Sequence, residues 1–436
     1  MNLAFGRGLD QRGAETTLAP GFVRDVVNLD IAPGQYAQKV PLGHARTRIG
    51  RTLVTADAGL RGGWCDPRVG FALLVSGTTL MALFDDGALL PVADGLDADS
   101  RVCAEFVPEA GAVFWSAGST TGRIVDGVAA AWGLPDPAAP SLSSGAGGVL
   151  RAGTYQVAVS LRAASGLESA LSPVTEIAIA DDGALADDGA LLFVTVPALP
   201  AGASSWRVYM SARDGDGLYW SADFTGTSTV IDADAGGRMA GTRFHARFPA
   251  CQTLCHWHGR MWGGLGALLV FSAIVDGAPA LHLIDAAGGY FPFDAPVRMI
   301  APVLDGLYIG TDAAVWFLAG TEPADLRRVR VDGAGVLGHL MIPASAFPLQ
   351  APEGTDRVPA WVSADGEVIV GRAGGMVQRL TQDTVSVRPG ATAALAYLRD
   401  GRGERLVASM PSAAAAPWTA DTIAVASLLD NGIALP

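Results

Sequence analysis

At 436 residues the chain exceeds the roughly 250–300 residues at which a single hydrophobic core stops growing, so we expect at least two domains. Its 43 acidic and 30 basic residues give a net charge of −13, which repels a phosphate backbone and argues against tight binding of DNA or RNA. The one lysine, Lys39, does not follow a glycine, so the Gly-Lys-Ser/Thr pattern of a phosphate-binding loop does not occur.

Membrane insertion and export are not indicated. No apolar run approaches the ~18 uncharged residues of a membrane-spanning helix, and the opening MNLAFGRGLDQRGAE has no apolar run of signal-peptide length. Four cysteines in so long a chain do not make a disulfide scaffold, and we expect most of them to be small buried hydrophobic residues. The sequence therefore predicts a soluble protein without an export signal.

The recurrent local signal is the dipeptide Asp-Gly, which occurs twelve times between Asp86 and Gly401. Between apolar runs, Asp-Gly is typical of a two-residue hairpin turn, because both central residues of a type I′ turn take positive φ. The runs between these turns are short and rich in Val, Leu, Ile, Phe, Tyr and Trp, as strands require. The sequence predicts an all-β protein.

Four segments share one pattern of turn, strand, small-residue turn and strand: residues 71–87, 110–127, 305–320 and 365–380. Each is predicted to form two strands around a tight turn, the expected centre of a β-propeller blade. An insert, described next, interrupts the pattern. At ~45 residues per blade, the rest of the chain is long enough for about seven blades, and we predict between six and eight.

The segment WGLPDPAAP at residues 132–140 interrupts this pattern. Its three prolines remove backbone donors and fix φ, so neither a helix nor a central strand continues through it. A Ser/Gly loop follows, and then six candidate strands at the spacing of a fibronectin-type sandwich: residues 154–162, 174–180, 191–197, 205–212, 218–223 and 228–232. Because strand side chains alternate, Trp206 and Tyr209 should lie on opposite faces, with one of them in the sandwich core.

These patterns divide the chain into two predicted domains. The first is a discontinuous β-propeller made of residues 1–139 and 249–436. The second is an inserted immunoglobulin- or fibronectin-III-like β-sandwich, residues 140–248. A propeller accommodates such an insertion because its blade loops lie on the surface.

The sharpest cluster of candidate metal ligands is CQTLCHWHGRMW, which contains Cys251, Cys255, His256 and His258. Zinc uses these ligand types, but a zinc finger separates its two ligand pairs by a loop. If the run is a strand, His256 and His258 share one face while Cys255 lies on the other, so the four cannot converge on one tetrahedral ion. On this geometry we predict no metal site. The sequence alone does not decide whether Cys251, Cys255, His256 and His258 bind a metal.

Two acid-rich segments, residues 181–191 and 212–220, lack the spaced oxygen ligands and distal glutamate of an EF-hand loop, and hairpin turns explain them without calcium. No Gly-x-Ser-x-Gly elbow and no HExxH motif is present, and the six histidines are scattered. We therefore expect no enzymatic activity, no catalytic residues and no cofactor.

The opening segment carries a Leu-x-Pro-Gly, Arg-Asp, Asn-x-Asp pattern at Leu18, Pro20, Gly21, Arg24, Asp25, Asn28 and Asp30. This pattern resembles the start of tailed-bacteriophage β-propeller proteins of the tail hub or nozzle type, also described as tail tubular or DNA-stabilisation proteins. The WGLPDPAAP segment is similar to the linker that such proteins place before a fibronectin-like insert, and GLESALSP (residues 166–173) is similar to a phrase inside it. Residues 256–273 and 306–320 match the blades that resume afterwards.

The resemblance implies a structural virion protein that forms a homo-oligomeric ring, expected to be a hexamer, below the portal or adaptor of a phage tail. The protein would be assembled in the host cytoplasm, and its insert would dock other tail proteins or tail fibres, with no membrane partner. Genomic double-stranded DNA would pass through the lumen without specific binding. An acidic surface suits such a conduit, so we expect the lumen to be net negative.

Two alternatives remain open. The first is a propeller-based protein that binds or cleaves glycans, which requires an acid-lined pocket with an aromatic floor. The second is an intracellular β-scaffold with an unidentified partner. Ring formation or co-purification with virions separates the phage interpretation from both.

Overall fold

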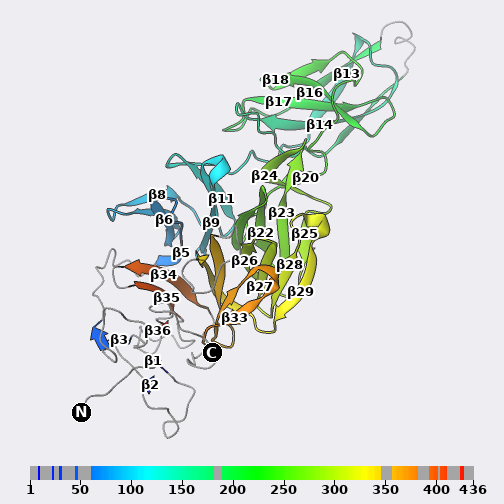
Figure 1. Ribbon diagram of the computed structural model, residues 1–436. Coiled ribbons are helices and arrows are strands. Elements are labelled where there is room, and N and C mark those ends of the chain that lie inside the picture. The colour runs from blue at the N-terminus through cyan, green and yellow to red at the C-terminus, as the bar shows by residue number, and fades with distance from the viewer. Residues whose placement is uncertain are drawn as a thin grey trace, which may run out of the picture. The chain divides into compact units, whose positions relative to one another are not determined.

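The computed structural model describes residues 60–180, 189–344, 356–381, 392–400, 403–409 and 423–426, together with four strands of two or three residues nearer the N-terminus. Strands dominate these residues, and the helical segments among them are three-residue 3₁₀ turns (Figure 1). None of the described helices is long and apolar enough to cross a bilayer. The prediction of an all-β protein is confirmed.

The chain forms two compact units. We call residues 59–262 and 270–291 the insert-bearing unit, and residues 1–58, 263–269 and 292–436 the C-terminal unit. Each unit is described by itself below.

The insert-bearing unit begins with two four-stranded antiparallel sheets in which each strand pairs with the next. The first sheet contains β5 (Leu60–Cys65), β6 (Phe71–Ser76), β7 (Thr79–Phe84) and β8 (Leu89–Ala93). The second contains β9 (Val102–Val107), β10 (Ala112–Ala117), β11 (Thr120–Val125) and β12 (Val128–Ala130).

A third sheet of the same kind follows the insert. It contains β21 (Thr253–Trp257), β22 (Arg260–Leu265), β23 (Leu268–Val275) and β24 (Ala278–Asp285). Two short strands extend it: β20 (His245–Arg247) pairs with β24, and β25 (Tyr290–Pro292) pairs with β23.

The C-terminal unit repeats the arrangement. One sheet contains β26 (Val297–Val303), β27 (Gly306–Thr311), β28 (Val315–Ala319) and β29 (Arg327–Asp332). The next contains β30 (Val336–Pro343), β31 (Arg357–Ser363), β32 (Val368–Gly371) and β33 (Val377–Arg379). A three-stranded sheet contains β34 (Ala394–Asp400), β35 (Gly403–Ser409) and β36 (Ile423–Ala426).

The first strands of successive sheets lie beside one another within each unit. Strand β9 contacts both β5 and β21 in the insert-bearing unit, and β30 contacts both β26 and β34 in the C-terminal unit. Four-stranded sheets of consecutive strands, aligned through their first strands, are the blades of a β-propeller. Among the described residues, four sheets have this form, a fifth contains the same four consecutive strands with two short strands added, and a sixth has three strands. These six sheets correspond to the lower end of the expected six to eight blades.

The repeated segments of the sequence form hairpins, as expected. Residues 71–87 form β6 and β7, residues 110–127 form β10 and β11, and residues 305–320 form β27 and β28, each pair at the centre of its sheet. The fourth segment differs, because residues 365–380 form β32 and β33, the outer pair of their sheet. Its partner β31 comes from residues that the pattern did not include.

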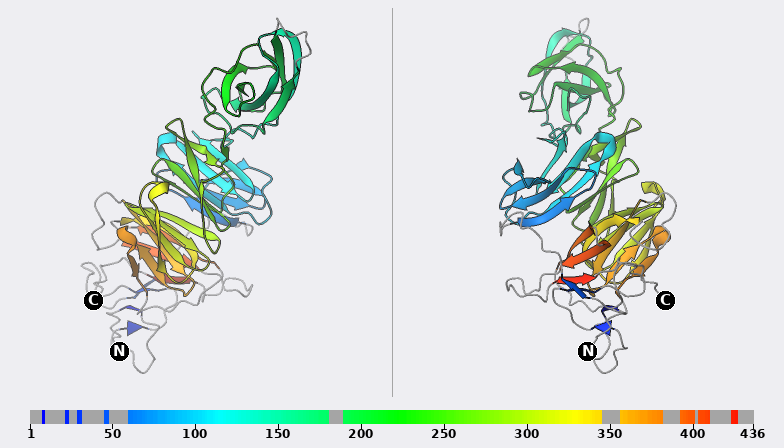
Figure 2. Two further views of the ribbon diagram at one scale, coloured as in Figure 1. Left: turned by 90° about the vertical axis from the view of Figure 1, so that its right-hand side faces the viewer. Right: turned by 60° about the vertical axis from the view of Figure 1, so that its left-hand side comes forward.

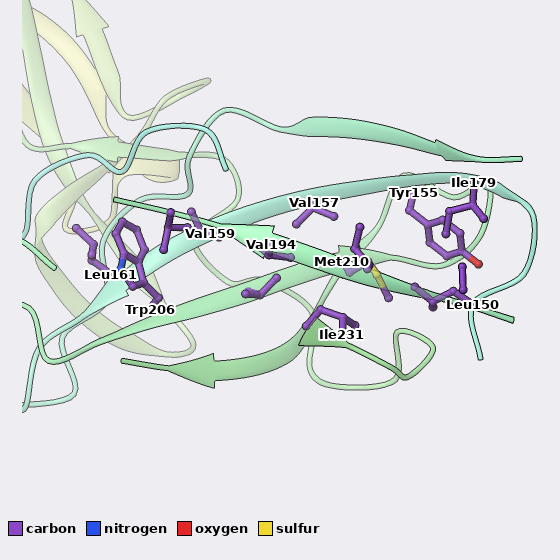
Figure 3. Close-up of a cluster of buried hydrophobic side chains, with 14 of the residues drawn as sticks. Leu150, Tyr155, Val157, Val159, Leu161, Ile179, Val194, Trp206, Met210 and Ile231 are labelled. Atoms are coloured by element: carbon purple, nitrogen blue, oxygen red, sulfur yellow. The ribbon is translucent and has the colours of Figure 1, made fainter. Parts of the chain in front are cut away.

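The insert forms a sandwich of two antiparallel sheets, drawn in teal and green in Figure 2. One sheet has the order β13 (Ser141–Gly148), β16 (Gly189–Thr195), β19 (Ser228–Ile231). The other has the order β15 (Thr175–Ile179), β14 (Gly153–Arg162), β17 (Ser205–Ser211), β18 (Leu218–Phe224). Figure 3 shows the apolar side chains of both sheets in one core, with Trp206 at one end and Tyr155 near the other.

Two features of the sandwich refine the sequence analysis. The six expected strands are present, but β13 is a seventh strand, formed by the Ser/Gly segment that was interpreted as a loop. Small residues suit this edge strand, because Gly148 lies against the backbone of Ala190, where a side chain would clash. Trp206 and Tyr209 do lie on opposite faces: Trp206 is in the sandwich core, whereas Tyr209 packs in a separate cluster with Leu218 and Ala240.

Two aromatic residues hold the ends of the insert together. Trp132, just before the insert, and Phe248, its last residue, are each 2% exposed, and their rings stack at 5.0 Å and 21°. Trp132 also packs against Phe114 of β10, and its Nε1 donates to the carbonyl of Leu281 in β24 at 3.1 Å. The backbone N–H of Phe248 donates to the carbonyl of His282 in the same strand. Trp132 therefore joins both linkers of the insert to two propeller sheets.

A buried ionic cluster lies in the C-terminal unit. The Nη2 of Arg379 donates to Asp332 Oδ1 at 2.9 Å, and its Nη1 donates to Glu367. Asp332 is 5% exposed, and a buried carboxylate needs such a partner because desolvation penalises an unpaired charge. The Asp332 carboxylate is thus buried and already paired with Arg379.

Removal of the Trp132 ring should destabilise the protein. Trp132→Ala deletes a fully buried aromatic stack, which costs about 3–5 kcal/mol of unfolding free energy, and should also speed cleavage of the insert linkers by thermolysin. Urea unfolding and limited proteolysis measure the two effects. Phe244→Ala is the control, because that ring is 66% exposed; equal losses in the two variants would contradict the assigned role of Trp132.

Acid should weaken the fold through His339. This side chain lies on β30 opposite Trp361, and burial lowers its pKa to about 4, against about 6.5 in an unfolded chain. Protonation therefore favours the unfolded state, so the contribution of His339 to stability is complete above about pH 6.5 and declines as the pH falls toward 4.

The expected observation is a smaller loss of stability between pH 7 and pH 4.5 in His339→Gln than in the wild type, measured by urea unfolding at each pH. His258→Gln changes an exposed turn residue and should keep the wild-type loss. Identical pH dependence in wild type and His339→Gln would refute the assignment.

Candidate functional site

A pocket of about 480 Å³ lies in the insert-bearing unit, where the sandwich meets the hairpin of β23 and β24. The sandwich side supplies Glu168, Arg207, Tyr209 and Trp220. The hairpin side supplies mostly apolar or small side chains and two polar ones: Val275, Asp276, Ala278, Pro279, Ala280, His282 and Leu283. The pocket thus combines a charged and aromatic wall with a mainly apolar one.

Glu168 is the centre of the charged wall. Its Oε1 accepts hydrogen bonds from the hydroxyls of Ser160 and Tyr209, each at 2.6 Å, and its Oε2 accepts from Arg207 Nη1 at 3.2 Å. Strands β14 and β17 carry these donors side by side, with Ser160 opposite Arg207 in the register. Both oxygens of the carboxylate therefore act as acceptors in a fixed network.

Arg207 links Glu168 to a second carboxylate. Its Nε and Nη2 donate to the two oxygens of Asp223 at 2.7 and 2.9 Å, the bidentate geometry that arginine favours. Trp220 Nε1 and Arg162 Nη1 donate to the same carboxylate at 3.0 and 3.3 Å. The pKa of Asp223 is lowered, chiefly by its hydrogen bonds from Arg207. The carboxylate therefore stays ionised and accepts hydrogen bonds.

Tyr209 is not a reactive phenol. Burial, and then its hydrogen bond to the Glu168 carboxylate, raise the pKa of Tyr209 above its usual value near 10, because both disfavour a phenolate. Its O–H points at Glu168 and is used there. The charged wall can offer aromatic surface and further Arg207 donors to a ligand.

Three contacts attach this wall to the propeller hairpin. His282 of β24 hydrogen-bonds through Nε2 to the Glu168 carbonyl at 2.8 Å, Arg238 pairs with Asp276, and Ala170 packs among Ala273, Ala280 and Leu283. Burial lowers the pKa of His282, so it is neutral at pH 7 and donates as an imidazole. The pocket is therefore the unfilled part of a packed junction between two domains.

The Cys/His run does not form a metal centre. Strand β21 ends at Trp257, and His258 begins a two-residue turn with φ of +49°, followed by Gly259 at +69°, so the expectation that His256 and His258 share a strand face is wrong. The run folds this way because His258–Gly259 takes the type I′ turn that Asp-Gly forms at Asp126–Gly127. Among the described residues, no three His, Cys, Asp or Glu side chains gather closely enough to hold a metal ion.

Three of the four cysteines lie in surroundings that favour the protonated thiol over the thiolate. Cys251 and Cys255 are buried and Cys103 is partly buried, in line with the expectation for most of the cysteines, whereas Cys65 is exposed. Burial raises the pKa of Cys103 to about 12 and also raises the pKa values of Cys251 and Cys255. Metal binding and nucleophilic attack both need the thiolate, which these three positions disfavour.

The acid-rich segments are partly visible. Residues 181–188 lie outside the described residues. In the other segment, Asp214 Oδ1 accepts from the Thr154 N–H at 2.8 Å, and Asp214 takes a left-handed φ of +57°, which is turn geometry. This supports the hairpin interpretation of residues 212–220.

The sequence does not predict the network of Glu168, Arg207 and Asp223. These residues are spread over 56 positions and meet only because β14, β17 and β18 pair. The one available signal was the phrase GLESALSP, which contains Glu168 and Ser169 and was noted only for its resemblance.

Comparisons with known proteins give no family. No family model matches the chain, and no curated protein matches it. Solved structures with a similar arrangement include BBS1N in complex with ARL6DN (12% identity, TM-score 0.31, covering 82% of this chain and 88% of that one). Kluyveromyces lactis Hsv2 (8%, 0.29, 80% and 89%) and the AfRom2 CNH domain (7%, 0.28, 81% and 91%) are further examples. At these TM-scores the likenesses carry no argument about function.

Removal of the Arg207 charge should loosen the charged wall. Arg207→Met leaves Glu168 and Asp223 without their shared partner, and we expect a loss of about 1–3 kcal/mol in unfolding free energy. Arg213→Met is the matched control, because its ion pair with Asp214 spans 3.8 Å and is exposed. Urea unfolding compares the two, and an equal effect would show that the Arg207 network adds nothing to stability.

Proposed function

We propose that this chain is a non-enzymatic structural subunit of a tailed-bacteriophage tail. It forms a homo-oligomeric hub or nozzle ring, a hexamer, below the portal or adaptor. DNA passes through the ring without specific binding, and the inserted sandwich docks neighbouring tail proteins or fibres. The protein is assembled in the host cytoplasm and resides in the virion.

The observation that carries this proposal is the way in which the sandwich is attached to the propeller sheets. The insert leaves after β12, the last strand of its sheet, and returns at β20, which pairs with the outer strand β24. Its two linkers are stacked through Trp132 and Phe248, and its body is fixed by the contact of His282 with the Glu168 carbonyl. A domain fixed on the outer side of propeller blades serves docking, because a fixed domain loses little entropy when it binds.

The chemistry of the pocket supports a role without catalysis. Glu168 and Asp223 both accept hydrogen bonds from Arg207, and these bonds lower the pKa of Asp223. The net charge of −13 supports a conduit that does not retain DNA. The assignment to a phage tail rests on the resemblance of the opening segment and the WGLPDPAAP linker to tail hub and nozzle proteins.

Mass spectrometry of purified virions from a producing culture tests the proposal, together with tail-tip decoration by an antibody against the sandwich. We expect peptides of the chain in intact particles and label at the tail. Absence of the chain from purified particles that contain their other tail proteins would overturn the proposal.

A second candidate is a glycan-binding protein. It is favoured by Trp220, which is 41% exposed at the pocket beside Tyr209 and Arg207, since sugars stack on such rings and bind such donors. A glycan array tests it: binding that Trp220→Ala abolishes would support this candidate, and an array without signal would remove it.

A further inference from the structure

Strand β29 carries an unusual concentration of positive charge. It reads Arg327-Arg328-Val329-Arg330-Val331-Asp332, and its first four residues are exposed. The chain as a whole has 13 more acidic than basic residues, so three arginines within four positions stand against its overall charge. We call Arg327, Arg328, Val329 and Arg330 the arginine edge.

Among the described strands, the arginine edge is an open sheet edge. Strand β29 is the outermost strand of the sheet β26–β29 and pairs with β28 on one side (Figure 1). Its second side presents backbone groups of the kind that another strand can pair with. Val329, 53% exposed, adds an apolar contact at the middle of this edge.

Nothing in the described part of the chain neutralises these charges. The one carboxylate of the strand, Asp332, is buried and is bound by Arg379. Arg328 donates to the carbonyl of Pro292 at 3.0 Å and Arg330 to that of Gly333 at 3.3 Å, which leaves most of their five N–H donors unused. Arg327 forms no hydrogen bond or ion pair with the described residues.

The guanidinium groups are nevertheless held in place. Arg328 lies over the rings of Phe293 and Trp316, with its guanidinium carbon at 5.4 and 4.9 Å from their centroids, and Arg330 lies 5.9 Å from that of Trp316. Stacking orders an arginine without using its donors, so it lowers the entropy lost when a carboxylate binds. Alternation along the strand places Arg328 and Arg330 on one face, two residues apart.

We infer that the arginine edge is the surface through which one copy of this chain binds a second copy. The partner surface is an extended, carboxylate-bearing segment whose acidic side chains meet Arg328 and Arg330. Charge complementarity selects this occupant, because a chain with a net charge of −13 repels its own copies except where one of them presents positive charge. A contact between unlike surfaces forms a ring when the rotation between subunits closes and a filament when it does not. This inference rests on the proposed function, which requires the ring, and names the surface of its subunit contact.

The test uses the full-length triple variant Arg327→Gln, Arg328→Gln, Arg330→Gln, followed by mass photometry over a concentration series. Three surface ion pairs are worth roughly 10- to 100-fold in the self-association constant, so we expect assembly to weaken by that factor. Raising the ionic strength should weaken the wild type toward the variant. The matched control is Arg101→Gln, Arg151→Gln, Arg213→Gln, which removes the same charge from exposed arginines elsewhere and should assemble like the wild type.

The outcomes separate the two proposals. Circular dichroism should be unchanged in the variant, since the mutated side chains are exposed. Thermal unfolding should shift only slightly, because each lost contact of an exposed arginine with a ring is worth about 0.5–1 kcal/mol. Assembly of the variant with wild-type affinity would overturn the arginine edge as the contact and leave virion membership intact. A wild type that remains monomeric at every concentration would also overturn it. Self-association that depends on these arginines, in a protein absent from virions, would support the arginine edge and overturn the phage assignment.

Discussion

The polypeptide passes between propeller and sandwich twice, and the stack of Trp132 on Phe248 is where the two passages meet. The covalent connection alone does not hold an inserted sandwich in one orientation, because the backbone of its two linkers can rotate. The stacked rings and the hydrogen bond from Trp132 Nε1 to Leu281 replace that freedom with packing against β10 and β24. The pocket, the Glu168 network and any docking role of the insert all presuppose this junction.

Charge is handled in two opposite ways in this molecule. At the pocket, Arg207 is shared between Glu168 and Asp223, and the network is closed on itself. At β29 the arginines are stacked on aromatic rings but have no carboxylate among the described residues. The first arrangement satisfies partly buried ionic groups at a domain junction, because charged groups removed from water are costly unless paired. The second leaves positive charge for another molecule to neutralise.

The repeated turn chemistry explains much of the fold. Asp126–Gly127 and Asp276–Gly277 take positive φ at both positions, the geometry that matches the twist of antiparallel strands. His258–Gly259 forms the same turn with a histidine in place of aspartate. A histidine that appeared to be a metal-ligand candidate in the sequence is therefore explained by its backbone conformation.

The sequence by itself determined the all-β class, most of the central hairpins and six of the seven sandwich strands, because turn residues and period-2 alternation act over a few neighbouring residues. It missed β13, since the run SLSSGAGG has the composition of a loop and becomes a strand only through pairing with β16. The network of Glu168, Arg207 and Asp223, the stack of Trp132 with Phe248 and the isolation of the β29 arginines were decided by the tertiary structure. Each depends on which distant strands become neighbours, and long-range pairing of that kind leaves no trace in local composition.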